Sequence, residues 1–151
     1  MPGVLRADIG EIDHYFLHAG FRQQHDGARI AQLNTWLLAT RESAELRAQT
    51  EQMGRSMLDW LRQQSADDDP RVATLAALAP APAWPIAFSL GCVQAGADAH
   101  ESVLACGFAW AENQVQAALK AVPLGQRAGQ RILARLAQEL GPLAQTALTL
   151  N

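Results

Sequence analysis

Residues 99–122 read AHESVLACGFAWAENQVQAALKAV, and the pattern is that of one long helix. Apolar residues recur at intervals of three and four along this segment and form two separate stripes. The first stripe holds Leu104, Phe108, Ala111, Val115, Ala118 and Val122, and the second holds Val103, Cys106, Trp110, Ala117 and Ala121. A helix that is apolar on two sides is usually enclosed by neighbouring helices. We therefore expect residues 99–122 to form the buried central helix of an all-α bundle.

Both ends of this segment carry the signals of helix termini. Asp98 precedes the first turn and Glu101 follows three residues later, a spacing typical of a capping box. Pro123 follows the last turn, and its ring cannot continue the backbone hydrogen bonds of a helix. The helix should therefore begin after Asp98 and end before Pro123.

The rest of the chain is also typical of helices separated by proline and glycine. We expect helices at residues 8–19, 28–64, 71–79, 85–94 and 124–140, and a last short helix ending near Leu148. The apolar stripe changes phase across residues 40–43, which predicts a bend or break there. Residues 65–70 should form a solvated acidic linker, and residues 80–85 an extended connection. Gly141-Pro142 should break the helix that precedes it.

Composition supports the same fold class and excludes several others. The 151 residues include 29 Ala and 20 Leu but only 11 Val and Ile together, which favours helices over strands. The length predicts a single domain spanning residues 1–151. A net charge of −3 offers no broad basic surface for nucleic acid. No apolar run approaches the ~20 residues that cross a membrane, and the first residues lack the pattern of a signal peptide.

The sequence contains none of the common signatures of catalysis or cofactor binding. It has no Walker loop, dinucleotide fingerprint, Cys-x-x-Cys or His-Glu-x-x-His motif. His14 and His18 lie four residues apart and could share a metal ion, but no third ligand accompanies them. Cys92 and Cys106 lie in apolar segments, so we expect reduced core residues. We therefore predict a non-enzymatic cytoplasmic protein without a cofactor, with His14 and His18 as weak metal candidates.

Two clusters of polar residues require a different explanation. One lies in residues 41–55, where Arg41 with Glu45 and Glu51 with Arg55 have the spacing of ion pairs along a helix. The other begins at residues 112–116, on the helix expected to be buried, and continues to Arg131. Polar groups on an enclosed helix need partners. These partners could lie within the fold or across an interface with another protein.

The same two regions resemble a known family. Residues 37–47, LLATRESAELR, followed by QMGRS at 52–56, are similar to one helix of the urease accessory protein UreF. Residues 110–118, WAENQVQAA, leading into KAVPLGQ at 120–126 and GQR at 129–131, resemble the second signature of that family. The resemblance covers about residues 33–140.

The resemblance implies an all-α, non-enzymatic, cytoplasmic chaperone that forms a homodimer. Such proteins bind UreD, called UreH in some species, recruit the GTPase UreG and dock on apo-urease so that nickel and carbon dioxide reach its active site. By position, Lys120 matches a basic site associated with coupling to the GTPase. The other residues implied to bind partners are Glu42, Glu45, Arg47, Gln52, Gln126 and Arg131.

The chain departs from the family pattern at both ends. We find no counterpart of the family's Ser-Pro-rich opening segment or of its closing tail, and we expect a chain truncated at both ends relative to the family. The alternative function is a generic helical adaptor that binds other proteins and has no connection with urease.

Overall fold

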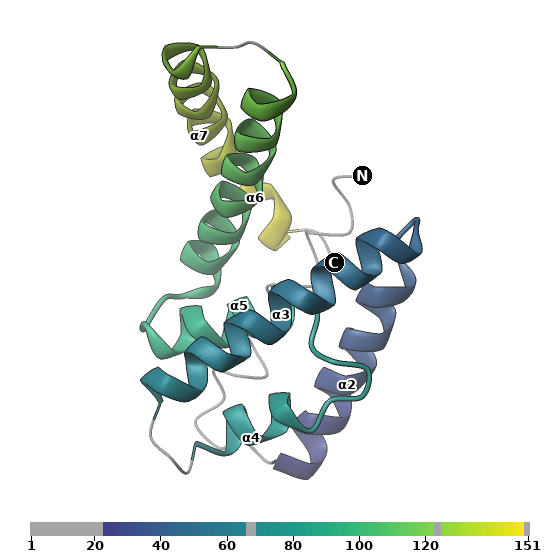
Figure 1. Cartoon of the computed structure of the whole chain (residues 1–151). Coiled ribbons are helices and arrows are strands. Elements are labelled where there is room, and N and C mark those ends of the chain that lie inside the picture. The colour runs from purple at the N-terminus through teal and green to yellow at the C-terminus, as the bar shows by residue number, and fades with distance from the viewer. Residues whose placement is uncertain (1–22, 66–68, 123–124, 150–151) are drawn as a thin grey trace.

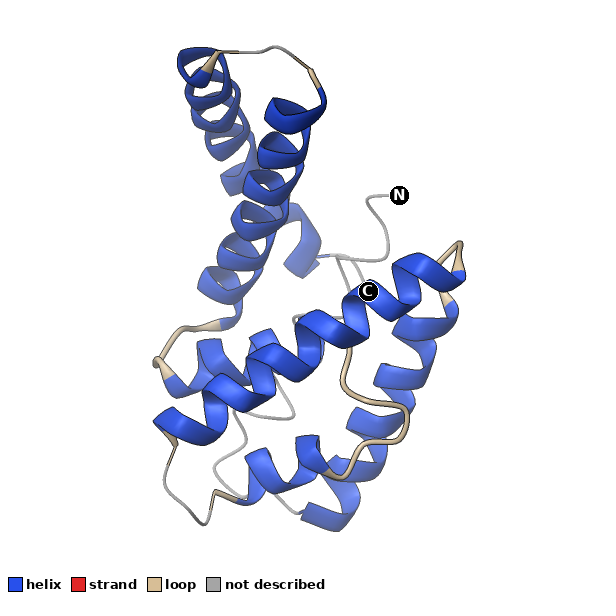
Figure 2. Cartoon of the chain, viewed as in Figure 1, coloured by secondary structure: helices blue, strands red, loops and turns tan. Residues whose placement is uncertain are grey.

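The computed structural model describes residues 23–65, 69–122 and 125–149, and all regular elements in these ranges are helices (Figures 1 and 2). In chain order they are α2 (Gln23–Ala39), α3 (Ala44–Gln64), α4 (Pro70–Ala76), α5 (Trp84–Gln94), α6 (Ala99–Ala121) and α7 (Gln126–Thr149). The all-α prediction is confirmed over these residues. The helix predicted at residues 8–19, which carries His14 and His18, lies outside them.

The hydrophobic core lies among α2, α3, α4 and α5, in the lower half of Figure 1. All four helices contribute buried apolar side chains, whose removal from water drives folding. The buried core residues are Ile30, Leu33, Leu37, Leu38, Leu58, Leu61, Val72, Leu75, Ala83, Ile86, Ala87 and Leu90. We call this part of the molecule the body.

The buried helix of the fold is α5, so the prediction that residues 99–122 are enclosed was wrong. Buried residues of α5 are Pro85, Ile86, Ala87, Ser89, Leu90 and Cys92, more than half of its 11 residues. In α6, 4 of the 23 residues are buried, namely Ser102, Cys106, Ala111 and Val115. The sequence of α5, WPIAFSLGCVQ, has no charged residue and suits burial on all sides. The second apolar stripe of α6 is instead largely exposed.

Helices α6 and α7 form an antiparallel hairpin that projects from the body (Figure 1). Val115 and Ala118 of the first predicted stripe of α6 face α7, and a leucine lies over a glycine near each end of the contact. Leu119 of α6 covers Gly129 of α7, and Leu140 of α7 covers Gly107 of α6. A Cβ at either glycine would come within 2.7 and 2.9 Å of the leucine carbons. The two glycines therefore set how closely the helices approach.

Most of the predicted helix boundaries agree with the structure. Asp98 and Glu101 form the predicted capping box, with each side chain accepting from the backbone N–H of the other residue at 2.8 and 2.9 Å. The predicted break near residues 40–43 separates α2 from α3, and the Ser43 hydroxyl accepts from the N–H of Leu46 at 3.2 Å. Helix α4 ends at Ala76, three residues earlier than expected.

Gly141-Pro142 does not break the last helix, contrary to the prediction. Helix α7 continues through Pro142 to Thr149. Proline disfavours a helical conformation in the residue before it, because its ring crowds that residue's N–H and Cβ. Residue 141 is a glycine and has no Cβ. The glycine therefore removes one part of the steric conflict between Pro142 and the preceding turn.

One buried side chain of α2 holds the proline-containing segment 80–83 against the body. Asn34 is 1% exposed. Its Nδ2 donates to the carbonyl oxygens of Pro80 and Ala81, both at 3.1 Å, and its Oδ1 accepts from the N–H of Ala83 at 2.7 Å. Buried backbone groups that lack partners cost free energy. Asn34 supplies these partners and so fixes the path of the chain into α5.

Gly54 of α3 lies against the same segment. A Cβ at this position would overlap the carbonyl oxygen of Pro82. One turn earlier, the Thr50 hydroxyl accepts from the N–H of Trp84 at 3.3 Å. Helix α3 therefore meets the segment at backbone contact distance, which requires a residue without a side chain.

A cluster of hydrogen bonds joins the ends of α3, α4 and α5. The Asp69 carboxylate accepts from the N–H of Arg71 at 2.9 Å and from its guanidinium at 2.7 and 3.0 Å. Gln94 Nε2 donates to Asp69 at 3.1 Å and to the Ser65 hydroxyl at 2.7 Å. Hydrogen bonds from the Arg71 side chain lower the pKa of Asp69 to about 2. The side chain of Asp69 is 10% exposed, so this end of the predicted solvated linker is structural.

We expect Asn34→Ala to lower the free energy of unfolding by about 3 kcal/mol, because it leaves buried backbone groups of residues 80–83 without partners. Urea denaturation followed by far-ultraviolet circular dichroism measures this loss. Asn113→Ala, at an exposed position of α6, should change stability by less than about 0.5 kcal/mol. Equal losses in the two variants would contradict the role assigned to Asn34.

Gly54→Ala should destabilise the protein by more than about 2 kcal/mol, because the new methyl group overlaps the segment beside α3. Helix propensity alone favours alanine by about 1 kcal/mol, so the predicted sign is opposite to the intrinsic effect. Ala48→Gly, exposed on the same helix, measures that intrinsic term. An unchanged or higher denaturation midpoint for Gly54→Ala would show that α3 does not press on the segment.

Stability should fall by about 2 kcal/mol as the pH drops from about 4 to about 2, through the protonation of Asp69. The pKa of this carboxyl is lower in the folded protein than in the unfolded chain, so the unfolded chain binds the proton first and the stabilisation is present only above this range. Asp69→Asn keeps a residue suited to the helix N-cap but removes the titration. Urea midpoints at several pH values should therefore differ between the two proteins above pH 4 and converge near pH 2. If the urea midpoints of the two proteins changed in parallel with pH, Asp69 would not be the group whose protonation lowers stability.

Candidate interaction surface

The seven residues predicted to bind partners are all exposed and fall into two groups. The first group lies at the corner between α2 and α3 and along the first half of α3. The second group lies at the loop end of the α6–α7 hairpin, away from α3 (Figure 1). The first group is Glu42, Glu45, Arg47 and Gln52, and the second is Lys120, Gln126 and Arg131. The structure therefore does not bring the two signatures together into one site.

The first group surrounds the start of α3. The pKa of the Glu45 carboxyl is lowered by its own backbone N–H and by the Ser43 hydroxyl. The predicted pair of Glu51 and Arg55 is formed at 3.5 Å. The predicted pair of Arg41 with Glu45 is not formed, and the Arg41 Nε is buried without a hydrogen-bond partner. Negative charge near a helix N-terminus is favourable, so Glu45 stabilises α3 whether or not it contacts a partner.

The second group lies in a basic part of the chain. Lys120 is in the last turn of α6, and Arg131 is in the second turn of α7, after the loop. Neither residue forms an ion pair with a described residue. Solvated cations without partners in the fold are free to meet an acidic surface on another protein.

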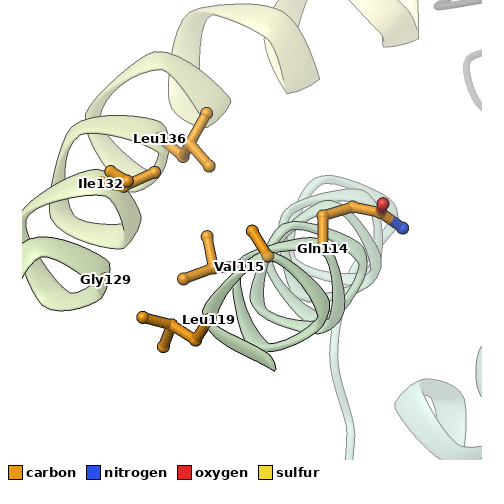
Figure 3. Close-up of a pocket in the computed structure, with 7 residues that line it drawn as sticks. Gln114, Val115, Leu119, Gly129, Ile132 and Leu136 are labelled. Atoms are coloured by element: carbon orange, nitrogen blue, oxygen red, sulfur yellow. The ribbon is translucent and has the colours of Figure 1, made fainter. Parts of the chain in front are cut away.

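An apolar groove of about 220 Å³ runs between α6 and α7 beside these cations. Figure 3 shows Val115 and Leu119 pointing from α6 toward α7, with Ile132 and Leu136 on the facing side. Gln114 also lines the groove, and its side chain is directed away from α7 (Figure 3). Ile132 remains 42% exposed, so the hairpin contact leaves part of its apolar surface open.

Sequence reasoning missed the exposed apolar residues of the hairpin. Among the described residues, five of the eight large hydrophobic side chains with the greatest exposure lie here: Phe108, Trp110, Val122, Ile132 and Leu143. Trp110 is 50% exposed. On α6 the signal was present in both apolar stripes of residues 99–122, with Trp110 in the second and Phe108 and Val122 in the first, and both stripes were interpreted as buried faces. Contiguous exposed apolar surface marks contact sites, and these side chains are the candidates for such a surface on the hairpin.

The polar residues of α6 also acquire a simpler explanation. Glu112, Asn113, Gln114 and Gln116 are exposed to solvent. They do not require hydrogen-bond partners inside the fold, because α6 is not enclosed. The sequence left two kinds of partner possible for these polar side chains, namely groups within the fold or groups on another protein. Because the side chains are exposed, the geometry permits the second.

The described residues contain neither a cluster of metal ligands nor a helix able to span a membrane. No group of three or more His, Cys, Asp or Glu side chains in residues 23–65, 69–122 and 125–149 could hold a metal ion. Cys92 and Cys106 are buried, as predicted for core residues. Over the same part of the chain, none of the helices is both long and apolar enough to span a bilayer.

Comparison with known proteins identifies the family. The UreF family model matches residues 1–137. The urease accessory protein UreF of Methylibium petroleiphilum is 54% identical over 126 residues, covering 83% of this chain and 53% of that protein. The UreF of Paracidovorax citrulli is 54% identical over 127 residues, with coverage of 83% and 51%, and that of a Polaromonas species is 49% identical over 125 residues, with 83% and 53%. The chain spans about half the length of these curated relatives. The resemblance of the two signature segments is confirmed, and the chain belongs to the UreF family.

Proposed function

We propose that the chain acts as a chaperone in urease maturation. In this function it binds UreD/UreH and the GTPase UreG, and the complex docks on apo-urease so that nickel enters the urease active site. Nickel is the cargo of the process, and the chain itself catalyses no reaction. We infer that it works in the cytoplasm as a homodimer, as in the family that it resembles.

The observation that carries this proposal is the family match over residues 1–137. The exposure of both signature groups supports a role in binding proteins, because residues needed only for folding are usually buried or paired. Lys120 and Arg131, at the loop end of the hairpin, are the residues that we assign to coupling with the GTPase. We assign Glu42, Glu45, Arg47 and Gln52 to contacts with the other partners.

Co-purification tests the proposal directly. The tagged chain, co-expressed with the UreD/UreH and UreG proteins of its own organism, should retain at least one of them through affinity purification. Lys120→Glu combined with Arg131→Glu should reduce the retained UreG about five-fold or more, because the charge reversal opposes an acidic partner surface.

Arg62→Glu is the matched control, because this arginine is exposed on α3 outside both signatures. It should retain each partner as the unaltered chain does. If neither UreD/UreH nor UreG is retained by the folded chain, the proposed function fails and the generic adaptor is favoured.

A further inference from the structure

The loop half of the hairpin is strongly basic in an otherwise acidic protein. Residues 113–138 contain four basic residues and no acidic one, which leaves eight basic and fifteen acidic residues, a net charge of −7, in the rest of the chain. The four are Lys120 on α6 and Arg127, Arg131 and Arg135 on α7. The arginines are spaced by four, so they form one row along the helix. Among the described residues only Arg135 of the four has an ion-pair partner.

An apolar surface separates Lys120 from this row of arginines. On α6, Trp110 is half-exposed, and Ala117 and Ala121 are exposed on the same side of the helix. Beside them lies the groove between α6 and α7, where Ile132 is partly exposed (Figure 3). The small alanine side chains allow another backbone to approach α6 closely. This open strip is therefore shaped for a rod-like partner.

Cations border the strip on both sides. Lys120 lies three residues after Ala117, and Arg135 lies three residues after Ile132, so each cation adjoins an apolar residue on the helix surface. From Trp110 onward, α6 offers about 18 Å of length, which corresponds to about three turns of a docked helix. We define this strip with its bordering cations as the hairpin surface.

We propose that the hairpin surface docks an acidic amphipathic helix of a partner protein. The apolar face of that helix packs over the alanines and the groove, and its Asp and Glu side chains meet the cations at the edges. This inference rests on the proposed function in one respect, namely that the docked helix belongs to a partner protein. It adds the position of the contact and the chemistry of the helix that occupies it.

Two other occupants fit the surface less well. A two-fold dimer through this surface would place it against itself and bring cations against cations. Nucleic acid would match the charges, but its phosphates would lie over the tryptophan, alanine and isoleucine side chains and lose hydration there. An acidic helix satisfies both the charged edges and the apolar centre.

The test uses the whole chain and a fluorescein-labelled helical peptide of about 14 residues, with Leu and Ala on one face and Glu elsewhere. A second peptide carries Lys in place of every Glu. Fluorescence anisotropy should show that the acidic peptide binds at least ten-fold more tightly than the basic one, and that added salt weakens its binding. Trp110→Ala, and Lys120→Glu combined with Arg131→Glu, should each weaken binding of the acidic peptide at least five-fold.

Matched controls come from the body. Trp60→Ala removes an equally exposed tryptophan of α3, and Arg62→Glu reverses an exposed arginine there. Both should bind the acidic peptide as the unaltered chain does, and circular dichroism verifies that all variants are folded. Binding of the acidic peptide without retention of any urease protein supports the hairpin surface and contradicts only the proposed function.

Four results would overturn the inference. The two peptides could bind equally well, or the body variants could weaken binding as much as the hairpin variants. A single-stranded oligonucleotide could bind more tightly than the acidic peptide and displace it. Sedimentation equilibrium could show that Trp110→Ala converts a dimer into a monomer, which would assign the surface to a second copy of the chain.

Discussion

The attachment of segment 80–83 by Asn34 is the constraint on which the arrangement of the body depends. This segment leads into α5, which carries no charged residue, and it must enter the core without exposing α5 to water. Its prolines remove backbone donors, while its carbonyl groups still need partners. Asn34 provides two donors and one acceptor from a single buried side chain. Gly54 completes the arrangement by allowing α3 to lie directly on the segment.

Burial of α5 has a consequence for the rest of the chain. Because α5 packs mainly against α3 within the core of the body, α6 contacts the body mainly through α5, and among the described helices α7 covers most of the rest. Two helices cannot bury each other on every side, so apolar residues such as Trp110 and Ile132 remain partly exposed. The exposed surface of the hairpin thus follows from the same packing that encloses α5. It does not require a separate explanation in terms of poor folding.

Local signals of the sequence predicted the helices well, because caps, prolines and apolar spacing act over a few residues. The capping box at Asp98 and the break before Ser43 are examples. The position of the buried helix was misassigned, because the two stripes of residues 99–122 indicate two apolar faces but not whether anything covers them. The break predicted at Pro142 was also wrong, because the effect of a proline on a helix depends in part on the residue before it, and Gly141 has no Cβ. The residues that the family resemblance implied for partner binding stay predictions, and Trp110 was not among them.

The structure also separates roles that are mixed within each signature segment. In the first segment, Ser43 caps α3 and Gly54 admits segment 80–83, whereas Glu42 is exposed and contributes nothing to the core. In the second segment, Gly129 lies under Leu119 and sets the spacing of the hairpin. Lys120, in contrast, forms no ion pair with a described residue. Family resemblance alone cannot make this distinction, because packing and binding residues alternate along one helix at the same spacing. Substitutions at the glycines should therefore act through stability, and those at the exposed charges through affinity.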